Sequence, residues 1–469
     1  MDFATGIVFV LVTTFALSYG WGMRGLLVGG EKGAMVPGAM LGIMLAWFSG
    51  SEVVRENYWF LTAAGLMAMT FGGTETYGET IGMTLHRERE TYNPVKGYGG
   101  LALKGALWFS VAAGFVGMTF GAMTGEIYKW YDIVALFVAM PLLQEIGYRI
   151  FNTPYDKQAK KFPKIFFSLT RREEWGRNVF VLLEIAVLAA VRGDWLTLIM
   201  AAAGAISGAI GWIVAMRFYV LSAYPMKNSK WFFGILSKKK LIEGWKTMEF
   251  TLGAFGGLGI SLCWWICFGM VEERTAVIER NGGVWSAFGE SDIIGSVAVT
   301  ACMVMLLAMN IWQYYKYYKK QKVNTFIYDL LERPLYCNIP LALVMLGSAF
   351  SARIMSFFML FFAMALKCAY DRFVNFKTVR IWQAVLTLCS VAVFVGDILL
   401  GGYSIFATWF VCTVPYLALD LVHFFRPESL AVMKERKAKG ESALRIFGIV
   451  FIWFTVQIIV LNIIGLKLF

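Results

Sequence analysis

Apolar runs long enough to cross a lipid bilayer recur along the whole sequence, and they constrain its fold more than any other feature. A helix needs about 20 apolar residues to span the hydrocarbon, and about 14 candidate runs are present. Backbone polar groups inside lipid must bond to one another, so runs of this length form helices. The sequence therefore predicts an all-α polytopic membrane protein with about 14 transmembrane helices.

The candidate spans cover roughly residues 4–20, 34–49, 58–76, 100–124, 132–149, 178–192, 196–216, 249–270, 293–314, 335–351, 354–370, 381–400, 403–425 and 443–466. The two that flank Arg353 are either a hairpin pair or one broken segment.

The composition agrees with a membrane protein. The chain is 58% hydrophobic and 16% charged, whereas soluble domains average about 25% charged residues. Its net charge of +12 does not indicate nucleic-acid binding, because the Lys and Arg residues lie in short connectors between apolar runs. The seven cysteines lie mostly inside those runs, so neither a disulfide framework nor a zinc site is expected. No motif indicates a cofactor.

The charges of the connectors predict the orientation. Lys and Arg gather after the odd-numbered spans, for example at Arg87, Lys160, Lys238, Lys320 and Arg436. Connectors after even-numbered spans carry few of them, and the segment 271–292 is acidic. Positively charged loops stay in the cytoplasm. We therefore expect a multi-pass protein of the plasma (cytoplasmic) membrane with both termini outside.

Similar local sequences predict an internal repeat. The first span ends in Gly22-Met-Arg24 and the fifth in Gly147-Tyr-Arg149. The fourth and eighth spans both open on glycine, near Lys104 and Glu249 respectively, and continue with small residues. This pattern predicts a first four-helix unit at 1–128, a second at 129–271 and a C-terminal bundle of about six helices at 272–469. Chance similarity between glycine-rich helices is the alternative.

The glycine-rich stretch 18–38 places Arg24, Glu31 and Lys32 at or within the membrane boundary. Non-helical backbone at that depth survives only where it is buried in protein or lines a wet cavity. We interpret this stretch as part of a site, and a tight, well-packed turn is the alternative.

Ionisable residues inside the other spans extend this candidate site, because such residues are expensive in lipid and mark functional sites. Glu75 and Glu79, and likewise Glu145 and Arg149, share a helix face at i,i+4 spacing. The predicted solute- or ion-binding set is Arg24, Glu31, Glu75, Glu79, Lys104, Glu145, Arg149, Glu184 and Glu249. We expect these residues to surround one polar cavity that opens toward the cytoplasm. Buried ion pairs that only fix helix register are the alternative.

Three function classes fit this pattern. The first is a secondary transporter or permease for a small polar or anionic solute, with intramembrane carboxylates as coupling groups and Glu184, the deepest, as the proton carrier. The second is an integral-membrane transferase that acts on a lipid or lipid-linked substrate at the cytoplasmic face. The third is a membrane scaffold subunit of a complex. The expected partners are the bilayer and an unidentified small molecule, and self-association into a homo-oligomer stays open.

Overall fold

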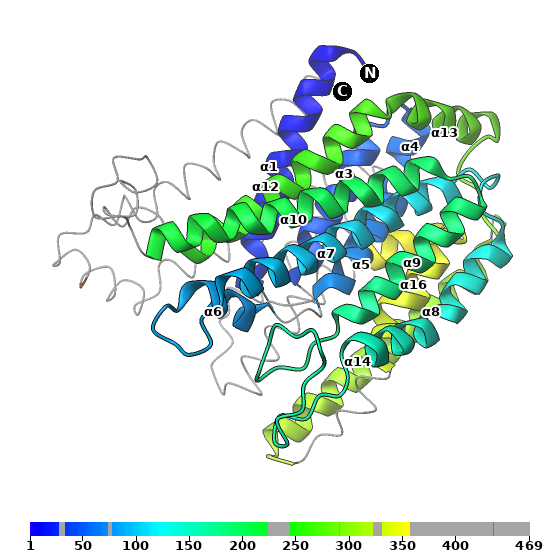
Figure 1. Cartoon of the computed structure of the whole chain (residues 1–469). Coiled ribbons are helices and arrows are strands. Elements are labelled where there is room, and N and C mark those ends of the chain that lie inside the picture. Colours follow the sequence, from blue (N-terminus) through cyan, green and yellow to red (C-terminus); the bar gives the residue numbers. More distant parts are fainter. Residues whose placement is uncertain are drawn as a thin grey trace.

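A computed structural model describes residues 1–27, 33–73, 77–223, 244–289, 291–321, 331–356 and 435. Every regular element within these ranges is a helix, and a single isolated β-bridge joins Asp156 and Lys161. The structure therefore confirms the predicted all-α class (Figure 1). Predicted spans eleven to fourteen lie outside the described residues, apart from the first few residues of span eleven.

The helices are α1 (Phe3–Leu27), α3 (Met35–Trp47), α4 (Glu52–Glu56), α5 (Trp59–Gly73), α6 (Gly78–Leu85), α7 (Pro94–Ala122), α8 (Trp130–Phe151), α9 (Trp175–Val191), α10 (Trp195–Ala223), α12 (Gly244–Ile266), α13 (Phe268–Arg280), α14 (Ile293–Tyr318), the π-helix η1 (Pro334–Asn338) and α16 (Ile339–Met345). In the part of the chain that the structure describes, six are long and apolar enough to cross a membrane: α1, α7, α8, α10, α12 and α14. These helices fit a multi-pass membrane protein, whereas the count of fourteen spans is not confirmed.

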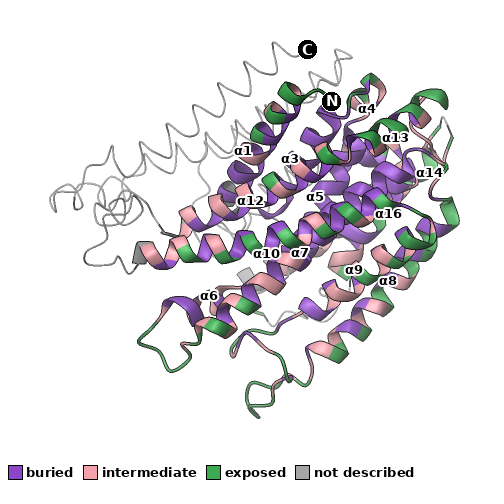
Figure 2. Ribbon diagram, turned by 45° about the horizontal axis from the view of Figure 1, so that its top comes forward, coloured by how far each residue is buried: buried purple, intermediate pink, exposed green. Residues whose placement is uncertain are grey.

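Within the described residues, the predicted second and third spans form two short helices. α3 has 13 residues and α5 has 15, and every residue of both is buried. At a rise of 1.5 Å per residue they reach only about 20 and 22 Å, less than the roughly 30 Å of hydrocarbon. They pack backbone to backbone, since a Cβ atom on Gly42 would lie 2.0 Å from the Leu61 carbonyl oxygen. Figure 2 shows this buried pair inside the bundle.

Six helices form a closed ring in which α1, α3, α5, α7, α10 and α12 each pack against the next, and α12 returns to α1. α1 and α7 face each other across the ring. Trp21 of α1 fills the space between them, with its ring centroid 4.9 Å from that of Trp108 and 5.0 Å from that of Phe109, both on α7. The helix pair α8 and α9 packs outside the ring, where α9 contacts α7.

The described helices do not confirm the tandem repeat. The four helices of the first predicted unit pack in sequence order, α1 on α3, α3 on α5 and α5 on α7. In the second predicted unit α8 packs on α9 and α10 on α12, but α9 packs more extensively on α7 than on α10.

The connectors alternate between two ends of the bundle. At one end the segment 267–289 contacts the chain start through Glu272 and the Met1 amine, 3.7 Å apart. The same segment reaches the connector after α7, where the Trp285 amide donates to the Met123 carbonyl at 2.9 Å, and the end of α16. These are connectors after even-numbered predicted spans. At the other end, the basic connector 152–174 packs against α6 and α7. We call these the acidic end and the basic end.

We predict that the basic end is cytoplasmic, so that loops 150–177 and 222–243 are inside and 271–292 is outside. Single cysteines replacing Lys157 and Glu273, both exposed, test this in a chain whose seven native cysteines are changed to alanine. In intact cells a membrane-impermeant maleimide should label Glu273→Cys, and should label Lys157→Cys only after permeabilisation. Labelling of Lys157→Cys in intact cells would reverse the orientation.

Candidate functional site

The structure describes most of the predicted site residues. Glu31 and Glu75 lie outside the described residues, and for Arg24 only its place near the end of α1 is described. The remaining six occupy four separate places in the fold.

Lys104 forms a buried ion pair at the basic end. The Lys104 ammonium lies 2.7 Å from Oε1 of Glu173, and the two side chains are 1% and 3% exposed. The ammonium also donates to the Thr80 hydroxyl at 3.0 Å, and Oε2 of Glu173 accepts from the Phe167 amide at 2.8 Å. A buried pair with this many hydrogen bonds has its charges satisfied. It ties α6, α7 and the connector 152–174 together.

Glu79 lies beside this pair on α6 and holds the same connector. Its Oε2 atom accepts from the Ser168 hydroxyl and the Leu169 amide, both at 2.6 Å, and from the Thr170 amide at 2.9 Å. Partial burial raises the pKa of Glu79, but these hydrogen bonds and the Arg171 charge outweigh it, so the pKa lies below its ordinary value of 4.5. Glu79 therefore stays ionised at neutral pH.

Glu145 and Arg149 form the predicted i,i+4 pair, with Nε of Arg149 2.9 Å from the carboxylate. The pair is exposed, at 41% for Glu145 and 74% for Arg149. Arg177 of α9 joins it at 3.2 Å and links the two outer helices. Exposed pairs of this kind contribute about 0–1 kcal/mol each.

Glu249 lies on α12 and is buried, with 2% of its surface exposed. Its Oε1 atom accepts a hydrogen bond from the indole nitrogen of Trp245 at 3.0 Å. Trp245 belongs to an aromatic group at the basic end of the ring, with its ring centroid 6.3 Å from that of Tyr77.

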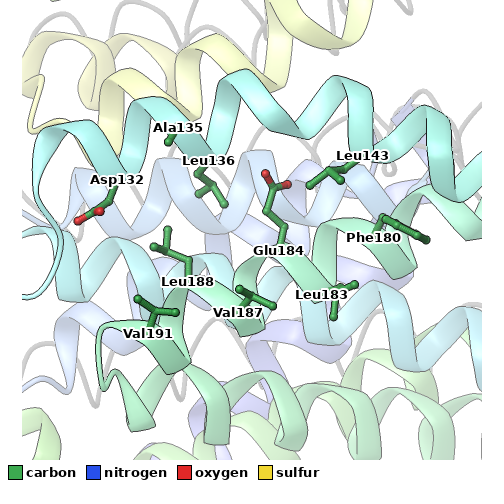
Figure 3. Close-up of a pocket in the computed structure, with 10 residues that line it drawn as sticks. All are labelled: Asp132, Ala135, Leu136, Leu143, Phe180, Leu183, Glu184, Val187, Leu188 and Val191. Atoms are coloured by element: carbon green, nitrogen blue, oxygen red, sulfur yellow. The ribbon is translucent and has the colours of Figure 1, made fainter.

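Glu184 stands apart from the other five. It projects from α9 toward α8 and lines a pocket of about 350 Å³ between these helices (Figure 3). Both of its carboxyl oxygens are buried, and among the residues that the structure describes neither has a hydrogen-bond partner. The pocket residues other than Glu184 and Asp132 are apolar: Ala135, Leu136, Leu143, Phe180, Leu183, Val187, Leu188 and Val191. Asp132 lies at one end of the pocket, where it pairs with Arg192.

The structure thus brings Glu79 and Lys104 together, pairs Glu145 with Arg149, and leaves Glu184 and Glu249 in surroundings of their own. One polar cavity shared by the whole set stays a prediction, because Glu31, Glu75 and the Arg24 side chain are not described.

A network at the acidic end was missed by the sequence analysis. Arg274 of α13 forms an ion pair with Asp194, and the two side chains are 7% and 0% exposed. Tyr128 donates to Asp194 at 2.6 Å, and Arg274 donates to the Gly117 carbonyl at 2.9 Å. Burial, and then the Asp194 carboxylate, raise the pKa of Tyr128, so its hydroxyl keeps the proton that it donates. The sequence feature that could have pointed to this network is Asp194, which directly precedes the Trp195–Ala223 helix. Aspartate is a common N-cap residue, so its position indicates a structural role.

In comparisons with models of known families, with curated proteins and with solved structures, nothing matches this chain. The helices define a class, that of multi-pass helical membrane proteins. Any functional conclusion therefore depends on the contacts described above.

Replacing Arg274 by Met should lower the free energy of unfolding by about 3–5 kcal/mol, because the Asp194 carboxylate would stay buried without its cation. Unfolding by sodium dodecyl sulfate in mixed micelles measures this. Arg280→Met is the matched control, since Arg280 is on the same helix but pairs with Glu126 at the surface. The double variant Arg274→Met/Asp194→Asn should lose less than Arg274→Met alone. Equal losses in Arg274→Met and Arg280→Met would contradict the role of the network.

Acid should release the connector 152–174 from α6. Because the folded pKa of Glu79 is depressed, its contribution is complete above its unfolded value of about 4.5 and is lost as the pH falls through the folded pKa. Hydrogen-exchange protection of the Leu169 and Thr170 amides, corrected for intrinsic rates, should therefore fall below about pH 4.5. In Glu79→Gln the two amides should be less protected at neutral pH, and their protection should not fall further below about pH 4.5. Glu90→Gln, an exposed glutamate in the neighbouring loop, should keep the step. An unchanged profile in Glu79→Gln would refute the assignment.

Proposed function

We propose that the chain is a proton-coupled secondary transporter of a small solute, with Glu184 as the coupling carboxylate. The observation that carries this proposal is the pair of buried, unpartnered carboxyl oxygens of Glu184 at the α8–α9 interface. An intramembrane acid is a functional candidate by default, because a charge at the helix centre costs about 2.5–3.5 kcal/mol. Glu184 makes no described structural contact through its carboxyl group, and a role in proton transfer would account for an acid at this position.

The position of Glu184 along the bundle supports this role. Along α9 it lies seven residues from Arg177 and eight from Arg192, or about 10 and 12 Å at 1.5 Å per residue. Arg177 pairs with Glu145 toward the basic end, and Arg192 pairs with Asp132 toward the acidic end. Glu184 is therefore midway between two charged pairs, where a carried proton would pause between the two faces.

The central helices α3 and α5 give a second line of support. Many secondary transporters place their sites at the ends of short or broken helices near the middle of the membrane. α3 and α5 are short, wholly buried and flanked by glycine-rich segments. The small polar or anionic solute expected from the sequence would bind near these ends.

The fourteen-span topology and the two four-helix units belong to this proposal. Basic connectors continue to alternate as far as Arg426 and beyond, which supports further spans after residue 356. In the repeat, Arg24 and Arg149 would hold equivalent places, as would Lys104 and Glu249. The transport proposal does not require the units to superpose.

For the transferase alternative, two of the residues that it could use, Glu79 and Lys104, already have partners. The alternative needs a free general base and a free cation at the basic end. Glu79 and Lys104 are already engaged by the connector 152–174 and by Glu173. A catalytic role for either would require those contacts to break.

Purified full-length protein in sealed proteoliposomes tests the proposal. Vesicles with a trapped pH-sensitive dye and an imposed pH gradient should show proton flux that depends on an added solute, with a panel of monocarboxylates, dicarboxylates, amino acids, phosphate and organic cations. Replacing Glu184 by Gln should abolish the pH-dependent component while the protein remains folded, because glutamine cannot carry a proton.

Glu273→Gln, an exposed glutamate on α13, is the control and should transport like the wild type. If Glu184→Gln keeps the full pH dependence, Glu184 is not the coupling acid. If no solute of the panel drives flux in wild-type vesicles, the transport proposal fails for these classes.

A further inference from the structure

We infer that the pocket between α8 and α9 binds a lipophilic organic cation, and that this cation and a proton exchange on Glu184. The inference rests on the proposed transport function. It names a substrate class for the Glu184 site, in place of the small polar or anionic solute expected from the sequence. The binding site itself can be tested without transport.

The lining of the pocket selects an apolar molecule. Eight of its ten lining residues have apolar side chains. The outer edge is open, since Leu183, Val187 and Val191 line the pocket and are 52%, 54% and 74% exposed. These residues belong to the apolar outer face of the bundle, so a ligand would enter from the hydrocarbon. The lining runs along α8 from Asp132 to Leu143, about 16 Å at 1.5 Å per residue, which suits an elongated molecule.

The charge of the pocket selects a cation. None of the ten described residues that line it is basic, and its two acids differ in their surroundings. Asp132 is paired with Arg192, whereas the two Glu184 oxygens have no partner. A buried carboxylate is tolerated only when a counter-charge or a proton accompanies it. An organic cation whose apolar part fills the pocket supplies both the counter-charge and the missing packing. An anion would be repelled by the Glu184 carboxylate and would find no basic side chain among the described lining residues to pair with.

The charged groups on the elements around α9 do not reach Glu184. They are Asp132, Glu145 and Arg149 on α8, Lys96 and Lys104 on α7, Arg217 on α10, Arg177 on α9 itself and Arg192 just after its end, while α5 has none. Asp132 is held by Arg192, Glu145 by Arg149 and Arg177, and Lys104 by Glu173. Lys96 lies over the Phe166 ring at the basic end, and Arg217 interacts with Tyr98. Among the described residues no charged group pairs with Glu184, so within this part of the chain a proton or a ligand is left to neutralise it.

The proton and the organic cation therefore exchange on the Glu184 carboxyl group. In the empty pocket Glu184 holds a proton on its carboxyl group. When the cation enters, the carboxyl O–H bond breaks, the proton leaves to water, and the carboxylate pairs with the cation. The step involves no redox change and no other co-reactant. Since one carboxyl group serves both ligands, each cation bound should release about one proton, and acid should weaken cation binding reciprocally.

Octyltrimethylammonium is a suitable probe, because it is elongated and its charge does not depend on pH. Titration calorimetry of the full chain in dodecyl maltoside, run in two buffers of different ionisation enthalpy, gives both affinity and proton release. Empty micelles provide the blank. Octane-1-sulfonate and octan-1-ol are controls of the same chain length with negative and zero charge. We expect binding of the cation with release of about one proton, and at least about tenfold weaker binding of either control.

Two variants localise the site. Glu184→Gln should bind the cation at least about tenfold more weakly and release no proton. Ala135→Phe places a large side chain in the pocket and leaves every charge in place, so it should also weaken binding. Glu273→Gln, the exposed matched change, should behave like the wild type. Equal binding by wild type and Glu184→Gln, equal binding of octanol, or binding without proton release would each overturn the inference. Unchanged binding in Ala135→Phe would do the same.

The two proposals fail in different ways. If the cation does not bind while Glu184-dependent proton flux is seen in proteoliposomes, the substrate class is wrong and the transporter stands. If the cation binds with proton release and no vesicle experiment shows flux, the site stands and transport is wrong.

Discussion

Direct contact between helix backbones at glycine is the interaction on which the ring of helices depends. Lipid tails are as apolar as leucine, so helices in a membrane associate mainly through close packing and hydrogen bonds. α7 and α10 meet where a Cβ atom on Gly208 would lie 2.1 Å from the Gly105 carbonyl oxygen. α1 and α12 meet in the same way, since a Cβ atom on Gly253 would lie 2.3 Å from the Leu17 carbonyl oxygen. Within this ring the side chain of Trp21 fills the space between α1 and α7, and α8 and α9 pack outside it.

Ionic contacts then close the two ends of this ring. At the acidic end Arg274 carries α13 onto Asp194, and at the basic end Lys104 and Glu79 hold the connector 152–174. The charges at these two ends have satisfied partners. Of the ionisable groups that the sequence analysis assigned to a site, Lys104 and Glu79 make contacts that hold the fold together. Glu184 differs because no contact in the described part of the chain uses its carboxyl group.

The sequence predicted the helices better than the site, for physical reasons. Hydropathy located α7 as 100–124 and α14 as 293–314, because every apolar helix carries that signal regardless of its surroundings. It could not show that α3 and α5 are short and wholly buried, since wholly buried and lipid-facing residues have the same composition. Local spacing predicted the pair of Glu145 and Arg149, which are four residues apart. Glu173 is 69 residues from Lys104 and Arg274 is 80 from Asp194, and no local pattern encodes such pairs.

The location of Glu184 also restricts how the proposed coupling could operate. α8 and α9 touch closely at one point, where a Cβ atom on Gly147 would lie 2.2 Å from the Gly176 carbonyl oxygen. The pocket begins beyond this contact and continues to Asp132, so the space opens between the helices away from their tightest contact. Exchange of a proton for a cation at Glu184 would change the spacing of α8 and α9 along the pocket. At the other end of the pair, the contact between Gly147 and Gly176 would keep the two helices together. Since α9 also packs on α7 of the ring, a change in the angle between α8 and α9 would reach the core through that helix. In the proposed mechanism the outer helix pair thus senses the proton, and the ring, with its short helices α3 and α5, responds.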